Sequence, residues 1–597
     1  MDPAHRLRRE RRVRQVPNNN HRLDSEAADA ALPAWRKESW RVAASYLIPL
    51  LVIALAQAGG FNHVVIMATA LTVALTHWAL PPISTTLFCI AIGHSIELAN
   101  SEKTRINGDG ILWQDIIYVL PNIQSNIGTT LQYIGYTGLA IGAGIAFCLA
   151  LTLKLERKHL RRSLLLGLAF SIALTLLYTH STGAYIDDVR QDLGRIADSP
   201  RAFAGQPQRS SVARFIHSIS LPPADFQTNK TESSVFRHAA DKLPGFVGAP
   251  TAGTPPDIFV LLNESQLDPM QLAACVGRND CRLSLYEKGP HSVMYGPLRV
   301  HTHGWGTWNA EFTLMTGVPY HWFGENGFYS PYTVAPRVRL ALAKHLSALG
   351  YRTIAVYPTQ KGMLNAARAY RTYGIQDFFG AEDLGLSLDW CKIPDSLMYE
   401  KLMQRYRGAK ADDNRPIFMV MLTIFNHGPH GEKCAAPELL AGLRNNASQE
   451  TLKLEDYLQR SHASDTAAKQ FRDTILESTE KALILFAGDH QPGFEGLHKA
   501  YPRKMHREMH TDEAFFFTGY QFFANYPILP RKDPEMPREM DIAFLGSTLL
   551  ELAALPLGPL FLPNSELRDL CAGRLDQCPN GNLIDSYKTT LLENGFL

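Results

Sequence analysis

Apolar residues are unevenly spread along the chain, and five apolar runs are concentrated in its first third. They occupy residues 42–59, 63–80, 83–98, 131–153 and 163–178. Their lengths approach the roughly 20 residues that an α-helix needs to cross a bilayer. So many clustered runs favour membrane-spanning helices over buried helices of a soluble protein. We therefore predict a transmembrane region of five helices at residues 42–180.

Two basic segments set the predicted topology. Residues 1–41 are basic and polar, and no apolar core follows their charges closely, so they are predicted to be a cytosolic tail and not a cleaved signal peptide. The second segment is KLERKHLRR, residues 154–162. Basic segments stay on the cytoplasmic side, and five crossings place both there, whereas four would separate them. The loop at 99–130 and all residues after 178 are then expected outside the cytoplasm.

A different pattern begins at residue 257, where continuous apolar runs end in polar residues. The runs are DIFVLLNES at 257–265, YRTIAVYPT at 351–359, RPIFMVMLTIFNH at 415–427 and KALILFAGDH at 481–490. Such runs are typical of strands buried on both faces of a parallel sheet. Helix-like segments separate them, for example at 337–350 and 465–480. We predict an α/β domain with a mainly parallel central sheet at 257–597, joined to the membrane region by a connector at 181–256.

Charge and cysteine content narrow the environment of this domain. The net charge of +2 is too small to argue for nucleic acid as a partner. Six cysteines follow the membrane region, and two pairs of them are only six and seven residues apart in sequence. Such pairs can close small disulfide loops in an oxidising compartment, whereas the short CxxC spacing of zinc sites is missing.

Candidate chemistry lies where the predicted strands end. Glu264, His427, Asp489 and His490 come directly after three of the apolar runs. Ligands of open α/β sheets bind at the carboxyl ends of the strands, so these side chains are expected to lie close together. Two carboxylates and an imidazole suit Zn²⁺ or Mn²⁺. The sequence therefore predicts one divalent metal ion at this edge of the sheet.

Thr307 lies in the unusual stretch HTHGWGTWNAEFTLMTGVP, residues 301–319, just before a helix-like segment. A threonine at the start of a helix is commonly only an N-cap. Beside a metal held by Glu264, Asp489 and His490 it acquires a second interpretation. Its hydroxyl would be the fourth ligand and, once activated, the nucleophile of the reaction.

These motifs resemble a known family. LLNES, GTWNAEFTLMTGVP, FNHGPH and FAGDHQP are similar to motifs of membrane-anchored, sulfatase-like phosphotransferases of the alkaline phosphatase superfamily, and most similar to lipoteichoic acid synthases and related phosphoglycerol transferases. The resemblance implies five transmembrane helices and an extracytoplasmic catalytic domain. It also implies that Glu264, Thr307, Asp489 and His490 bind the metal and that His427 contacts the phosphate. His498 is the candidate for a further catalytic histidine.

The expected substrate contacts depart from that family in one place. Lipoteichoic acid synthases carry a Trp-Asn-Arg set where this chain has Leu364, Asn365 and Ala366. Asn365 is kept, and Arg368 and Arg371 are the nearby candidates to replace the arginine. His430 and Trp308 are further candidates for substrate binding. The alternatives are that His430 is a surface histidine of its loop and that Trp308 packs within its loop.

The resemblance implies transfer of a phospholipid head group through a phosphorylated threonine. We expect phosphoglycerol from phosphatidylglycerol as the group transferred, with phosphoethanolamine from phosphatidylethanolamine as the alternative. Because the cysteine pairs suit a Gram-negative periplasm, the expected acceptor is a periplasmic glycan or another envelope polysaccharide, and the expected location is the inner membrane. A sulfatase-type hydrolase ranks lower, since no C/S-x-P-x-R signature is found. An inactive scaffold ranks lower too, because the four site residues are intact.

Overall fold

The structure is a computed structural model of the 597-residue chain. It describes residues 254–597, apart from 432–433, 437–447, 478–480, 494–496, 498–513, 529–537 and 580, and before them residues 111–119 and positions 86, 89, 93, 96, 99, 100, 215, 218 and 236. The predicted tail and membrane-spanning runs lie outside the described residues, except for isolated positions in the third run. In the described part of the chain, no helix is long and apolar enough to cross a bilayer.

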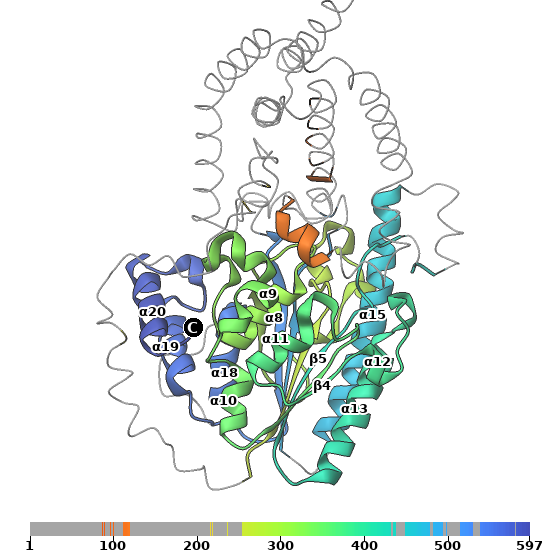
Figure 1. Cartoon of the computed structure of the whole chain (residues 1–597). Helices are drawn as coiled ribbons and strands as arrows, with labels where there is room; N and C mark the ends of the chain where they lie inside the picture. Colours follow the sequence, from red (N-terminus) through yellow and green to blue (C-terminus); the bar gives the residue numbers. More distant parts are fainter. Residues whose placement is uncertain are drawn as a thin grey trace, which may run out of the picture.

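An eight-stranded sheet forms the centre of the α/β domain (Figure 1). The order of its strands is β4-β3-β5-β1-β6-β7-β2-β8. Their bounds are β1 Asp257–Asn263, β2 Ser292–Arg299, β3 Arg352–Val356, β4 Asp377–Phe379, β5 Ile417–Leu422, β6 Ala482–Gly488, β7 Phe517–Ala524 and β8 Met540–Asp541. All paired neighbours are parallel except β7, which is antiparallel to β6 and to β2. The predicted α/β class and mainly parallel sheet are confirmed, and the four predicted strands lie side by side as β3, β5, β1 and β6.

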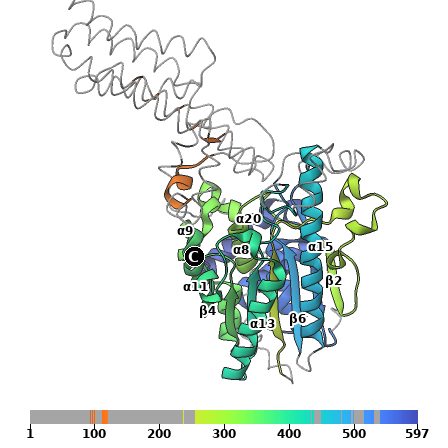
Figure 2. The same ribbon diagram turned by 90° about the vertical axis from the view of Figure 1, so that its right-hand side faces the viewer.

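The central strands are buried on both faces, which explains their continuous apolar sequences. In β1, Ile258 and Val260 belong to one hydrophobic cluster, whereas Phe259 and Leu261 belong to another. Successive side chains of a strand point to opposite faces, so these clusters are the two layers between sheet and helices. The resulting helix–sheet–helix arrangement is visible in Figures 1 and 2.

The helices divide between the two faces of the sheet. The first cluster is covered by α8 Thr307–Thr316, α10 Leu342–Ala348, α11 Ala366–Tyr373, α18 Leu545–Leu552, α19 Gly558–Leu570 and α20 Gly581–Glu593. The second is covered by α12 Ala381–Leu384, α13 Asp395–Asp412 and α15 Gln449–Leu476. The helix expected at 465–480 is therefore the second half of a much longer one. A single-turn helix, α9 Ser330–Thr333, follows the 3₁₀ segment η10 Tyr320–Tyr329.

Three disulfides tie loops of the domain. Cys275–Cys281 and Cys571–Cys578 close short loops, as their spacing suggested. The third, Cys391–Cys434, joins the turn before α13 to the loop that follows β5. Paired cysteines persist in oxidising compartments, so this pattern fits a domain outside the cytoplasm.

Candidate active site

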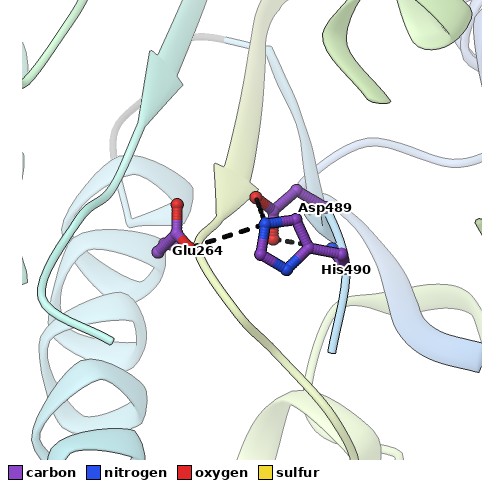
Figure 3. Close-up of side chains that lie close together, drawn as sticks. All are labelled: Glu264, Asp489 and His490. Carbon is purple, nitrogen blue, oxygen red and sulfur yellow. Dashed lines mark hydrogen bonds and ion pairs between the residues drawn. The ribbon is translucent and has the colours of Figure 1, made fainter. Parts of the chain in front are cut away.

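The pairing of β1 with β6 brings the predicted metal ligands together. In this parallel pair Asn263 lies opposite Gly488, and each is the last residue of its strand. Glu264 therefore emerges beside Asp489 and His490 at the carboxyl edge of the sheet (Figure 3). The Asp489 amide donates to the Asn263 carbonyl oxygen, 3.1 Å away, which extends the strand pairing into the site.

The three side chains form a compact, buried cluster. One ligand atom from each of Glu264, Asp489 and His490 lies within 4.8 Å of the other two. His490 Nε2 is 3.2 Å from Asp489 Oδ2 and 3.7 Å from Glu264 Oε1. The relative exposures of Glu264, Asp489 and His490 are 3%, 0% and 2%. Within the described residues, no other group of three acidic, histidine or cysteine side chains meets the same criterion of mutual approach.

A second set of contacts orients these ligands. The Ser265 amide donates to Asp489 Oδ1 at 2.8 Å, and Ser265 Oγ donates to Glu264 Oε1 at 2.7 Å. His490 Nδ1 lies 2.8 Å from the carbonyl oxygen of Gln491, which leaves Nε2 directed at the carboxylates. Partners of this kind fix the rotamer and tautomer of metal ligands. Ser265 and Gln491 follow predicted ligands directly, but nothing in their sequence positions indicated these roles.

Thr307 completes the cluster. Its Oγ1 donates to Asp489 Oδ2 at 2.7 Å, lies 3.3 Å from Glu264 Oε2, and is also 3.3 Å from His490 Nε2. The structure thus brings together all four residues that the motifs predicted as ligands. These residues come from three separate segments of the chain. Thr307 is 43 residues from Glu264 and 182 residues from Asp489 in sequence.

Thr307 is the first residue of α8 and not its N-cap. Gly306 occupies the N-cap position with φ of 87°, a left-handed conformation that favours glycine. A Cβ at Gly306 would also lie 3.1 Å from Thr302 Cγ2, so little space is left for a side chain. Because the glycine turns the chain into the helix, the Thr307 hydroxyl is free of a capping role and points to the carboxylates.

The electrostatics of the cluster favour a cation. Burial and then the neighbouring Glu264 carboxylate raise the pKa of Asp489, against the opposing influence of His490, and the net result is a pKa of about 7. Burial lowers the pKa of His490, but the carboxylates of Asp489 and Glu264 outweigh it, so the net shift is upward. Two adjacent carboxylates are costly to bury as anions unless a positive charge compensates them. Together with the imidazole they suit a divalent ion such as Zn²⁺ or Mn²⁺.

Glu311 is a site residue that the sequence analysis missed. It lies on α8 one turn after Thr307 and is 4% exposed. Burial is the main cause that raises its pKa, hydrogen bonding by Tyr370 and Tyr357 lowers it, and the carboxylates of Asp489 and Glu264 raise it, so that the net pKa is about 8. Glu311 is therefore largely neutral at pH 7, so it adds little negative charge to that of the Asp489 and Glu264 carboxylates. A single buried glutamate on a helix-like segment was the only available signal.

Replacing Glu311 with glutamine should flatten the dependence of stability on pH. A carboxyl group whose pKa rises from 4.5 to about 8 on folding binds its proton more tightly in the folded chain. Its contribution to stability is complete below pH 4.5 and is lost as the pH rises to about 8. The urea midpoint of the wild type should thus fall over this range, and that of Glu311→Gln should fall less. The exposed Glu400→Gln is the matched control, and an unchanged slope in Glu311→Gln would refute the buried-acid interpretation.

His427 is exposed and lies on the loop that follows β5. Its ring is 5.1 Å from that of Trp390, and its Nδ1 is 2.7 Å from the Gly428 carbonyl oxygen. Arg460, a buried residue of α15, donates from Nη1 to the carbonyl oxygens of Phe425 at 2.9 Å and His427 at 3.0 Å. The hydrogen bonds from Arg460 and the Cys391–Cys434 disulfide both restrain the loop that carries His427. The role of Arg460 could not be read from the sequence, because it lies 33 residues from His427.

Removing the Arg460 guanidinium should destabilise the domain strongly. Arg460 Nη2 lies 2.8 Å from Asp456 Oδ2, and the side chains are only 4% and 1% exposed. Breaking a buried pair leaves an uncompensated charge and typically costs roughly 3–5 kcal/mol. We expect Arg460→Met to lower the free energy of unfolding by about this amount in a urea titration. Arg415→Met, which breaks an exposed pair with Asp413, should leave the urea midpoint nearly unchanged, because solvent screens exposed ion pairs. Equal effects of the two substitutions would contradict the argument.

The remaining predicted residues lie in varied surroundings. His430 is buried, with its ring 5.4 Å from that of Tyr457, and burial holds its pKa well below the usual range. Trp308 donates from Nε1 to the Phe328 carbonyl oxygen at 2.8 Å. Asn365 Nδ2 donates to the Pro331 carbonyl oxygen at 2.7 Å, and Arg368 is exposed on α11. His498 lies outside the described residues. The substrate-binding and catalytic roles of these residues stay predictions.

Comparison with known proteins agrees with the predicted resemblance. Residues 298–553 match the sulfatase family, which confirms a sulfatase-like segment that contains Thr307, Asp489 and His490. An uncharacterized protein of Haemophilus influenzae is 28% identical over 348 residues, which cover 57% of this chain. The match spans only 61% of the length of that relative.

Two solved structures are similar at low sequence identity. One is the phosphoglycerol transferase GacH of Streptococcus pyogenes in complex with sn-glycerol-1-phosphate, at a TM-score of 0.44 and 16% identity, covering 62% of this chain and 98% of that one. The other is the lipooligosaccharide phosphoethanolamine transferase A of Neisseria meningitidis, at a TM-score of 0.43 and 12% identity, covering 86% and 95%.

Proposed function

We propose that the α/β domain is a metal-dependent phosphotransferase that moves a phospholipid head group by way of Thr307. The observation that carries the proposal is the position of Thr307 Oγ1, which lies within 3.3 Å of Glu264, Asp489 and His490 at the first residue of a buried helix. A simple N-cap would not need three buried ionisable partners. The match of residues 298–553 to the sulfatase family supports the same reading.

Glu264, Asp489, His490 and Thr307 would hold the metal ion, which is Mn²⁺ or Zn²⁺. When bound, such an ion lowers the pKa of a coordinated hydroxyl and stabilises charge on phosphoryl oxygens. The protein contributes a fixed geometry, because Glu264, Asp489 and His490 are buried and because Ser265 and Gln491 orient their side chains. The helix start also presents backbone amides and a partial positive charge toward a phosphate.

The proposed transfer takes two displacements. Thr307 Oγ1 attacks the phosphorus and forms a new O–P bond, while Asp489 Oδ2, which already accepts the hydroxyl hydrogen at 2.7 Å, takes the proton. The bond from phosphorus to the glycerol oxygen of the lipid breaks with its electron pair, and a histidine, His427 or His498, protonates the departing oxygen. A hydroxyl of the acceptor then attacks the phosphorus and gives its proton to the same histidine. The bond between phosphorus and Thr307 Oγ1 breaks, and Asp489 returns its proton to Thr307 Oγ1.

The proposed donor is phosphatidylglycerol, which supplies phosphoglycerol. Phosphatidylethanolamine is the alternative donor, and the similar structures bear the names of both transferase types. Asn365, Arg368, His430 and Trp308 are the proposed head-group contacts. The acceptor would be a periplasmic glycan or another envelope polysaccharide. Anchoring in the inner membrane with the domain in the periplasm agrees with the three disulfides.

Trapping the intermediate tests this proposal. The full chain, purified in detergent, is incubated with phosphatidylglycerol or with phosphatidylethanolamine, quenched in acid and examined by intact-mass spectrometry. A glycerophosphoryl adduct on Thr307 would identify the first donor, and a phosphoethanolamine adduct the second. Thr307→Ala should carry neither adduct. An adduct that survives in Thr307→Ala, or hydrolysis of both lipids with no covalent adduct at any time, would refute the phospho-threonine route.

A further inference from the structure

Residues 111–119 contact the α/β domain beside the helix that carries Thr307. We infer that this segment positions the nucleophile and does not act only as a link between predicted membrane helices. The inference rests on the proposed function in one respect, since it treats Thr307 as the attacking group. In sequence the segment lies in the predicted extracytoplasmic loop at 99–130. Figures 1 and 2 show it as the orange ribbon against the end of the domain that carries α9.

Two side chains of the segment anchor it to the domain. Asp115 Oδ1 accepts a hydrogen bond from the hydroxyl of Tyr329. The Tyr118 ring stacks on that of Tyr332, with centroids 4.0 Å apart and an interplanar angle of 9°, and lies 5.5 Å from the Tyr329 ring. Leu112 is fully buried and belongs to the same hydrophobic cluster as α8. The segment is therefore held on α9 and η10 by a hydrogen bond and by stacked aromatic rings.

The contacted residues in turn hold the first turn of α8. The Tyr329 ring stacks on Trp308 with centroids 5.9 Å apart and an interplanar angle of 14°. The Phe328 carbonyl oxygen accepts from Trp308 Nε1 at 2.8 Å and from Asn309 Nδ2 at 2.9 Å. Ser330 Oγ donates to Asn309 Oδ1 at 2.8 Å. Trp308 and Asn309 directly follow Thr307, so residues 328–330 determine where the nucleophile lies.

This external support matters because the start of α8 has no side-chain cap. Gly306 at the N-cap makes no side-chain hydrogen bond, so the usual local contribution to the first turn is missing. The contacts of Trp308 and Asn309 replace it. An error of about 1 Å in the position of a reacting group can cost up to about 100-fold in rate. Loosening η10 and α9 should therefore reduce the rate of the chemical step before it unfolds the domain.

The segment is itself held from the opposite side. The Trp113 amide donates to Ser218 Oγ at 2.7 Å, and Gln114 Nε2 donates to the Ser218 carbonyl oxygen at 3.0 Å. The rings of Trp113 and Phe215 lie 5.9 Å apart, nearly perpendicular. Phe215 and Ser218 belong to the predicted connector. Residues 111–119 thus lie between the connector and η10, as a positioning element requires.

Substitutions of Tyr118 in the full chain test the inference. With a water-soluble nitrophenyl phosphodiester as donor, Tyr118→Ala should lower kcat by about 10-fold and change KM by less than about 2-fold, because the site is misplaced but not removed. Tyr118→Phe keeps the stacked ring and should restore most of kcat. Tyr329→Phe removes only the hydroxyl that donates to Asp115, and it should also lower kcat. This second variant keeps the test decisive if Tyr118→Ala does not fold.

Hydrogen exchange provides a readout that does not need activity. Amides at 307–311 should exchange faster in Tyr118→Ala than in the wild type, while those of β5 should not change. The matched control is Tyr295→Ala, since Tyr295 is half-buried on β2 under Arg538. Wild-type kcat and exchange in both Tyr118→Ala and Tyr329→Phe, or equal losses in Tyr295→Ala, would overturn the inference. If the wild type transfers nothing, the proposed function fails, and the exchange comparison still decides the positioning role.

Discussion

Replacing Thr307 with alanine is expected to lower head-group transfer by roughly 1,000-fold or more, since loss of a nucleophile removes the whole covalent route. The protein should still fold, because α8 does not use Thr307 as its cap and the residues after it, from Asn309 to Thr316, are buried independently of the hydroxyl. The measurement is the transfer rate from phosphatidylglycerol to an envelope glycan acceptor, with the urea midpoint recorded alongside. Loss of the Thr307 hydroxyl should thus abolish transfer and leave the urea midpoint of the domain nearly unchanged.

Thr307→Ser is the matched control for this prediction. Serine keeps an oxygen near Asp489 and His490 but loses the methyl group that restricts the rotamer. It should retain measurable transfer, well above the level of the alanine variant, and should form the same covalent adduct. If Thr307→Ala transfers at close to the wild-type rate, Thr307 is not the nucleophile, and the phospho-threonine route would have to be abandoned.

Replacing His490 with alanine should have the second-largest effect, on metal binding as well as on activity. His490 Nε2 faces the carboxylates of Asp489 and Glu264, whereas Nδ1 lies against the Gln491 carbonyl oxygen, so Nε2 is the nitrogen available to a metal ion. Loss of an outer partner of a metal ligand already costs about 10–100-fold in metal affinity, so loss of a ligand should cost more than about 100-fold. Elemental analysis after dialysis should find about one ion per chain in the wild type and much less in the variant.

His427→Ala is the control for metal content, because the exposed His427 lies outside the buried cluster. It should retain the ion even if transfer is slow. Chelation of the wild type should abolish transfer, and added Mn²⁺ or Zn²⁺ should restore it, with the better ion identifying the cofactor. A metal-free wild type that transfers at the full rate, or a His490→Ala variant with an unchanged ion content, would contradict the assignment.

Local sequence was sufficient for the centre of the domain and for the ligands. The runs that became β3, β5, β1 and β6 are almost continuously apolar, which is typical of strands buried on both faces of a parallel sheet. Parallel strands place their carboxyl ends at one edge, so Glu264, Asp489 and His490 could be expected together before any coordinates. The match of residues 298–553 agrees with the motif resemblance. Strands β2 and β7 were not predicted. Both contain polar residues or glycine within the strand, so neither forms a continuous apolar run.

Tertiary structure alone decided which residues support that site. Glu311 is acidic in sequence but largely neutral in the fold, because helix α8 carries it into a buried layer beside Tyr370 and Tyr357. Arg460, which is 33 residues later in the sequence, donates a hydrogen bond to the His427 carbonyl oxygen from helix α15. Tyr118 reaches Tyr332 across 214 residues. Periodicity and strand ends report only local geometry, whereas burial, pKa and positioning depend on packing between distant segments, and that packing exists only once the chain has folded.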